Sequence, residues 1–317
     1  MPATPPSLPL NRADVVRQFA RRGTLEKARF LYDETAARMI DRLSYIRLQP
    51  QRLLDAGCGA GANLPLLRER YPGAAYVGLD ACAPLLAAAR EAHQPAATLA
   101  AKLGRIKARL AGSAPQRGAP EFVLADLADT RLPPESLDLV WSNLALHWHP
   151  EPHTVLAEWR RILRVDGLVM FSCLGPGTLR ELRTAIGVAG LRTATPGFVD
   201  MHDFGDLLVE NGFADPVMDQ ETLTLTYQTP QRLLEDVQAL GGNPAQGRRR
   251  GLATPTWRAR LYDALEAQRG QDGLIRLSIE VAYGHAWRAA ARRNAQGVTH
   301  VQVSAIGRGR PARDAAG

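Results

Sequence analysis

A glycine-rich turn, D-A-G-C-G-A-G at residues 55–61, ends a short apolar run at residues 52–56 and leads into a helical pattern from about Asn63 to Arg70. Glycines at alternate positions allow positive φ angles and let the backbone approach a ligand closely. The helix that follows directs its N-terminal N–H groups at an anionic part of that ligand. Dinucleotide-binding turns have two residues between their last two glycines, whereas the spacing here is D-x-G-x-G-x-G. The turn therefore favours a smaller nucleoside ligand.

Apolar runs of strand length alternate with helical patterns of about ten residues through the middle of the chain. Such alternation predicts βαβ units with right-handed crossovers and a doubly wound, mostly parallel sheet of the α/β class. The expected strands after the turn are Ala75–Leu79, Phe122–Ala125, Leu137–Ser142 and Gly167–Leu174, and the expected helices are Pro84–Ala92 and His153–Leu163.

The two ends of the chain have different patterns. Residues 12–47 predict two helices separated at Gly23, so we expect residues 1–49 to form a tail and cap helices. Residues 50–290 are expected to form the main domain, with additions after residue 175, and residues 291–317 a basic, disordered tail with one short edge strand at Val301–Ile306. Within the additions we expect helices at Phe204–Asn211, Pro230–Leu240 and Trp257–Gln268, and strands at Thr222–Thr226 and Leu274–Tyr283.

Acidic residues stand at the ends of the next two expected strands. Asp80 lies where a carboxylate can accept hydrogen bonds from both hydroxyls of a ribose, and Asp126 could hold the amino group of an adenine. An aspartate after a strand is also a common turn or helix N-cap residue. Because three strand ends in order carry matching features, we favour a binding site. The Ala-, Arg- and Pro-rich stretch at residues 93–120, between the two strands, is interpreted as a surface insertion without a catalytic role.

These segments resemble the motifs of class I S-adenosylmethionine-dependent methyltransferases, which have a Rossmann-like fold. The resemblance covers roughly residues 50–175 and rests on the turn, on Gly78-Leu79-Asp80, on Ala125-Asp126-Leu127 and on Ser142-Asn143-Leu144-Ala145. It implies a seven-stranded sheet whose final strand, at residues 274–283, is antiparallel. It also implies that S-adenosylmethionine is the cofactor and that the glycines face its methionyl part. The residues assigned to the cofactor site are Asp55, Gly57, Gly59, Gly61, Asp80, Asp126 and Asn143.

A narrower resemblance runs over nearly the whole chain. Residues 142–148 (SNLALHW), 177–183 (GTLRELR) and 283–287 (YGHAW) are similar to the malonyl-carrier-protein O-methyltransferases of biotin synthesis. That family methylates the free carboxylate of a malonyl group held on acyl carrier protein. A sister group of methyltransferase-like assembly factors for respiratory complex I shares many of these motifs, and residues 29–43 resemble that group too. The alternatives are therefore a methyltransferase with another substrate and an assembly factor that keeps the fold as a scaffold.

The proposed reaction requires few catalytic groups. A malonyl carboxylate is ionised at neutral pH and is already a nucleophile, so alignment is the main requirement. The candidates for lining the methyl-transfer pocket are Tyr32, Asn143, His147 and Trp148, although packing against the sheet edge is an equally good interpretation of His147 and Trp148. An arginine could clamp the carboxylate, but the sequence does not identify which one.

Composition sets further limits. Basic residues outnumber acidic ones by seven, and residues 245–317 carry thirteen bases against five acids. Bias toward arginine codons explains this equally well, but the run at residues 248–250 could dock an acidic acyl carrier protein. Basic residues interleaved with aromatics are absent, which argues against nucleic acid as a partner. The three scattered cysteines suit the cytoplasm and form no zinc or redox pattern, no metal site is expected, and no apolar run is long enough to span a membrane.

Overall fold

The computed structural model describes residues 7–23, 26–94, 118–249, 251 and 253–290. Most of the predicted insertion at residues 93–120, the predicted tail with its edge strand at Val301–Ile306, and Arg250 of the basic run lie outside the described residues. The proposed division of the chain at residues 49/50 and 290/291 stays a prediction.

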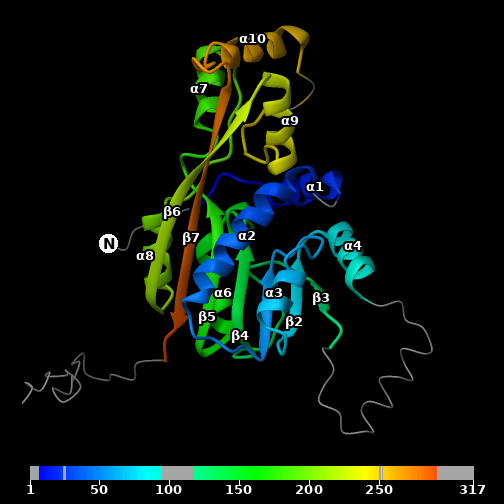
Figure 1. The fold of residues 1–317 in the computed structure, drawn as a ribbon, viewed down its shortest axis with the longest axis vertical. Coiled ribbons are helices and arrows are strands. Elements are labelled where there is room, and N and C mark those ends of the chain that lie inside the picture. The colour runs from blue at the N-terminus through cyan, green and yellow to red at the C-terminus, as the bar shows by residue number, and fades with distance from the viewer. Residues whose placement is uncertain (1–6, 24–25, 95–117, 250, 252, 291–317) are drawn as a thin grey trace, which may run out of the picture.

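A seven-stranded sheet with the order β3-β2-β1-β4-β5-β7-β6 forms the centre of the protein (Figure 1). The first five strands are parallel, and β7 runs antiparallel to both of its neighbours, β5 and β6. The predicted doubly wound sheet with an antiparallel final strand is therefore confirmed. The strands are β1 (Arg52–Ala56), β2 (Ala75–Asp80), β3 (Glu121–Leu124), β4 (Leu137–Asn143), β5 (Leu163–Leu174), β6 (Phe213–Tyr227) and β7 (Ile275–Arg288).

Helices cover the sheet, and two of them precede β1 as predicted. Gly23 ends the first at a φ of 65°, which explains the break seen in the sequence pattern. The helices are α1 (Arg12–Arg22), α2 (Arg29–Ser44), α3 (Leu64–Arg70), α4 (Ala83–His93), α6 (Pro152–Ile162), α7 (Arg180–Val188), α8 (Met201–Glu210), α9 (Pro230–Leu240) and α10 (Pro255–Glu266), with short 3₁₀ turns η1 (Glu26–Ala28) and η2 (Leu146–Trp148).

The largest differences from the prediction lie after residue 175. Strand β6 is much longer than the predicted Thr222–Thr226. Its first half was not predicted because intermediate and exposed residues alternate there, which gives no apolar run in the sequence. Pro216 lies where the β6–β7 register shifts, and a proline is tolerated there because it cannot donate to a sheet ladder. Helix α7 was not predicted; Leu179, at its N-cap, has a left-handed φ of 62°, which gives no sequence signal of a helix start.

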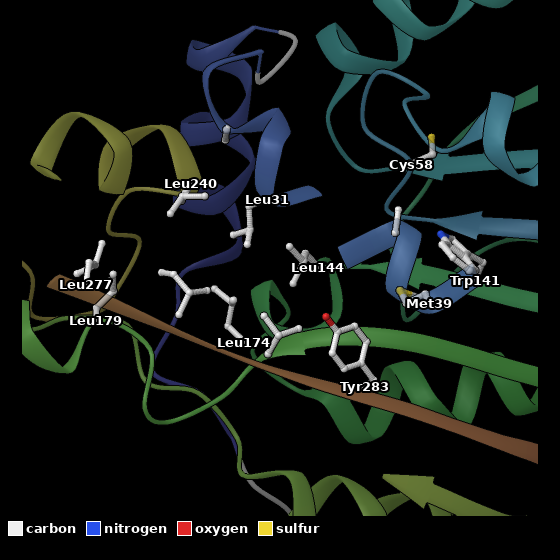
Figure 2. Packing of buried hydrophobic residues seen from close by; sticks show 14 of the residues in the cluster. Leu31, Met39, Cys58, Trp141, Leu144, Leu174, Leu179, Leu240, Leu277 and Tyr283 are labelled. Atoms are coloured by element: carbon white, nitrogen blue, oxygen red, sulfur yellow. The ribbon is translucent and has the colours of Figure 1, made fainter. Parts of the chain in front are cut away.

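Two apolar cores lie on opposite faces of the sheet. The first joins α2 and α3 to the elements after residue 175, and Figure 2 shows it reaching from Cys58 in the glycine turn, past Leu144, to Leu179 and Leu277. The second lies under α6 and α8 and includes Trp159, which is completely buried. Burying a large apolar side chain contributes about 1.5–3 kcal/mol each, so both cores stabilise the sheet.

The β6–β7 pair continues beyond the rest of the sheet. Strand β5 pairs with β7 only as far as Leu174 and Val281, whereas β6 follows β7 down to Ile275. The extension carries α7, α9 and α10 at one end of the molecule (Figure 1). The Glu181 carboxylate of α7 accepts hydrogen bonds from the Ser278 hydroxyl at 2.6 Å and its N–H at 2.8 Å, which fixes α7 to the extension.

Candidate functional site

A cavity of about 380 Å³ lies at the carboxyl ends of β1, β2 and β4, which is the edge at which doubly wound sheets bind ligands. Its volume falls within the range of small-molecule sites. The glycine turn forms its floor, and α1, α2 and α4 contribute its walls. The lining residues used below are Arg12, Val15, Val16, Phe19, Arg29, Tyr32, Gly57, Cys58, Gly59, Asp80, Cys82, Asp126, Asn143, Ala145, Trp148 and His149.

The glycine turn bends sharply over the end of β2. Gly57, Gly59 and Gly61 have φ angles of 82°, 54° and 80°, which disfavour residues with a Cβ. The N–H groups of Gly57 and Cys58 both donate to the Leu79 carbonyl, at 2.7 and 2.9 Å. A Cβ added to Gly57 would lie 2.3 Å from the Cβ of Ala145. Gly57 therefore permits the close approach of the turn to the segment after β4.

The Asp80 carboxylate holds the turn from the end of β2. One of its oxygens accepts the Gly59 N–H at 2.9 Å and the other accepts the Cys82 N–H at 2.7 Å. Burial raises the pKa of Asp80, and these backbone hydrogen bonds oppose the rise. Each carboxylate oxygen can accept a second hydrogen bond, so Asp80 both shapes the turn and can bind a ligand.

Asp126 is already engaged by protein groups. Its carboxylate accepts the Ala128 N–H at 2.8 Å, lies 3.2 Å from Nε2 of His149 and forms an ion pair with Arg12. Burial alone would raise the pKa of Asp126, but the hydrogen bonds from His149 and Ala128 and the charge of Arg12 lower it to about 2. A ligand amino group would therefore share Asp126 with Arg12, a contact that the sequence did not predict.

Asn143 joins α2 to the sheet. Its Oδ1 accepts hydrogen bonds from the hydroxyls of Thr35 and Ser172, both at 2.8 Å, and its Nδ2 donates to the Tyr32 carbonyl at 2.9 Å. Nδ2 also lies 3.4 Å from Oδ1 of Asn63. Sequence reasoning missed Thr35 and Ser172, which lie within ordinary helix and strand patterns. Asn143 and the backbone of Tyr32 are thus fixed together at the cavity.

The neighbours His147 and Trp148 have different surroundings, although their ring centroids are only 4.8 Å apart. Trp148 lines the cavity and packs edge-on against Phe19, with ring centroids 5.6 Å apart. His147 is 1% exposed and is not among the lining residues. Its Nδ1 accepts the Leu174 N–H at 3.2 Å, and burial lowers its pKa to about 3, so its imidazole is neutral. His147 is therefore a packing residue, as the alternative interpretation held, whereas Trp148 lies at the cavity.

Two residues that the sequence assigned to the ligand lie beneath the cavity. Gly61 packs closely against His93 of α4. A Cβ added to Gly61 would lie only 2.8 Å from the imidazole. Asp55 is fully buried and accepts the Tyr76 hydroxyl at 2.8 Å, with Nδ2 of Asn63 at 3.4 Å. Neither lines the cavity. Burial raises the pKa of Asp55 to about 7, although Tyr76 and Asn63 oppose the rise.

The buried Asp55 gives a pH-dependent stability. Because its folded-state pKa is above its unfolded value, its contribution is fully present below about pH 4 and is lost as pH rises through about 7. The Asp55→Asn variant keeps an acceptor for Tyr76 but does not titrate. We expect its free energy of unfolding, relative to that of the parent protein, to increase by roughly 1–3 kcal/mol from pH 5 to pH 8. Urea unfolding of both proteins without cofactor measures this difference. If the two proteins differ in free energy of unfolding by the same amount at pH 5 and at pH 8, the pKa of Asp55 is not raised in the folded state.

Comparisons with known proteins agree with this geometry. Residues 54–171 match the profile of the methyltransferase domain family. A malonyl-[acyl-carrier protein] O-methyltransferase of Laribacter hongkongensis is 45% identical over 270 residues, which covers 85% of this chain and 86% of the relative. One from Gallionella capsiferriformans is 41% identical over 275 residues, with 86% and 89% covered.

The chain belongs to the malonyl-[acyl-carrier protein] O-methyltransferase family. It is an S-adenosylmethionine-dependent methyltransferase. The solved YcgJ protein of Bacillus subtilis has the same fold, with a TM-score of 0.52 at 14% identity, covering 82% of this chain and all of that one. The family's cofactor fits the cavity, because its volume of about 380 Å³ suits a small ligand and each Asp80 oxygen, which accepts one backbone N–H, can accept a further hydrogen bond from a nucleoside.

Several residues that line the cavity were not singled out in the sequence. Arg12, Val15, Val16 and Phe19 of α1, together with Arg29 and His149, line the cavity. For the residues of α1 and α2 the only sequence signal was the helical pattern, which does not show what a helix faces, and His149 gave no signal. Among the described residues, no group of His, Cys, Asp or Glu side chains is placed to bind a metal ion. No helix in the described ranges combines the length and apolarity that a bilayer span requires.

Proposed function

We propose that the protein transfers a methyl group from S-adenosylmethionine to the free carboxylate of a malonyl group carried on acyl carrier protein, as a cytoplasmic step of biotin synthesis. The observation that carries this proposal is the 45% identity to the Laribacter hongkongensis enzyme over most of both chains. The excess of basic over acidic residues at positions 245–317 is compatible with an acidic carrier protein as partner.

The cavity supports this chemistry without a general base. S-adenosylmethionine supplies a methyl group that is already activated on its sulfonium. In this proposal Gly57 and Gly59 lie along the cofactor, Asp80 accepts its ribose hydroxyls, and Asp126 accepts its adenine amino group. Tyr32 and Trp148 enclose the acceptor carboxylate and exclude water, and Asn143 positions Tyr32 through its backbone. Orientation of this kind lowers a barrier by several kcal/mol.

Among the described residues two arginines line the cavity, one near Asp126 and one near Tyr32. Arg12 is paired with Asp126, on the side assigned to the adenine. Arg29 begins α2, three residues before Tyr32, so the two side chains share a helix face. The ion pairs of Arg29 with Asp33 at 3.0 Å and Glu26 at 4.0 Å are more than half exposed, and such pairs contribute little stability. We assign Arg29 as the clamp for the malonyl carboxylate.

Replacing Arg29 should affect the acceptor and spare the cofactor. We expect Arg29→Gln to raise KM for the malonyl substrate by about 10-fold or more, as expected for a lost charged hydrogen bond. The dissociation constant of S-adenosylhomocysteine should change by less than about twofold. Steady-state kinetics and calorimetry measure the two quantities. A matched loss of cofactor affinity would instead place Arg29 against the cofactor.

Growth without biotin tests the proposed function directly. The gene should restore growth to a strain that lacks this methyltransferase, and the purified protein should convert malonyl-carrier protein to its methyl ester. An Asp80→Ala variant serves as the inactive control. If the parent protein binds S-adenosylhomocysteine but does neither, the substrate assignment fails, and methylation of another substrate or an assembly role takes its place.

A further inference from the structure

Helix α1 forms one wall of the cofactor cavity. Arg12, Val15, Val16 and Phe19 line the cavity, and their i, i+3, i+4, i+7 spacing places them on one face of the helix. Figure 1 shows α1 between α4 and the end of the molecule that carries α9. The cavity is therefore complete only when α1 stays in this position.

A segment far along the chain holds the helix in place. Residues 243–248 belong to the connection between α9 and α10, and they lie along α1 and the residues before it. The Gln246 N–H donates to the Pro9 carbonyl at 2.7 Å, and the Gln18 side chain donates to the Asn243 carbonyl at 3.2 Å. The segment at residues 243–248 thus sets the position of this cavity wall.

One ion pair belongs to this contact. Arg248 lies 3.2 Å from Asp14, and the two side chains are only 26% and 14% exposed. Such a pair is less screened by salt than an exposed one. Asp14 also pairs with Arg17, 2.7 Å away and within the same helix, where Arg17 is 56% exposed. Asp14 therefore has one partner that fixes α1 to the 243–248 segment and one that does not.

We propose that Asp14 and Arg248 are positioning residues for cofactor binding, because their ion pair holds α1 against the cavity. Loss of the pair lets the wall move away from the bound cofactor, so the cofactor dissociates faster while the reacting groups are unchanged. The inference rests on the proposed function only in taking this cavity as the cofactor site. The pairing with Asp14 also removes Arg248 from the residues free to dock a carrier protein, so the docking interpretation of the run at residues 248–250 does not hold for Arg248.

Two matched variants of the full-length protein test the proposal. Arg248→Ser should raise the dissociation constant of S-adenosylhomocysteine about fivefold and raise KM for S-adenosylmethionine to the same extent, with kcat within about twofold. Arg17→Ser removes the other partner of Asp14 and should change the dissociation constant by about twofold or less. Calorimetry measures binding without any acceptor substrate, so the result is independent of whether malonyl-carrier protein is the substrate.

A double-mutant cycle separates positioning from general electrostatics. In an Asp14→Asn background, Arg248→Ser should have almost no further effect on the dissociation constant. Unchanged affinity in Arg248→Ser, an equal loss in Arg17→Ser, or a full additional loss in the Asp14→Asn background would each overturn the proposal. Thermal unfolding without cofactor checks that all variants are folded.

Discussion

Replacing Gly57 by alanine is expected to abolish cofactor binding at working concentrations. The new Cβ would lie 2.3 Å from the Cβ of Ala145, on a backbone with a φ of 82°. A left-handed conformation costs an alanine about 1–2 kcal/mol, and overpacking adds about 1–3 kcal/mol. Moving the turn relieves both costs but displaces the cavity floor, so we expect affinity for S-adenosylhomocysteine to fall about 100-fold or more, measured by calorimetry.

Two controls make the Gly57 prediction specific. Gly73→Ala places a Cβ where nothing lies within 4 Å, so affinity should not change. Adding Ala145→Gly to Gly57→Ala removes the clash and leaves the φ cost, so part of the affinity should return. No recovery in this double variant would show that backbone strain at Gly57, and not the contact with Ala145, accounts for the loss.

The second large effect is expected at Asp80. Asp80→Asn leaves one carbonyl oxygen where two carboxylate oxygens accept the Gly59 and Cys82 N–H groups. It also removes acceptor sites for a ribose. Hydrogen bonds to a charged group contribute about 1.5–3 kcal/mol, so affinity for S-adenosylhomocysteine should fall about 10- to 100-fold.

Asp138 provides the matched control for Asp80. Its carboxylate also accepts two backbone N–H groups, those of Gln51 and Arg52 at 2.8 and 2.9 Å, but it lies at the opposite end of the strands from the cavity. Asp138→Asn should lower the unfolding temperature and leave cofactor affinity unchanged. If both variants lose affinity equally, the effect of Asp80 is a general loss of stability.

Local sequence features were sufficient to predict the sheet from β1 to β5 and the main parts of the site. Each glycine of the D-x-G-x-G-x-G turn has a positive φ. Asp80 is the last residue of β2 and Asp126 lies two residues after β3, so periodicity and spacing locate both. The roles of these residues in binding stay predictions. The full lengths of β6 and β7 were not predicted, because much of β6 is exposed and has no apolar run.

Tertiary contacts account for what the sequence could not show. Asp55 and Asp80 look alike in the sequence, yet Asp55 is buried under the turn against Tyr76, while Asp80 lines the cavity. Arg12 and Arg248 looked like two of many surface arginines, and each is paired with an aspartate more than 100 residues away. No periodicity records such pairings, because they depend on how distant elements pack.

The position of β7 has a consequence for how the chain folds during synthesis. Among the strands of the described residues this one is made last, yet it lies between β5 and β6 in the sheet. Until Arg288 leaves the ribosome, β5 has an open edge and β6 has no neighbour to pair with. Open strand edges are the usual starting points of aggregation. A nascent chain of this protein therefore spends most of its synthesis with its sheet unclosed, and a messenger truncated before residue 275 would encode a chain that lacks an interior strand.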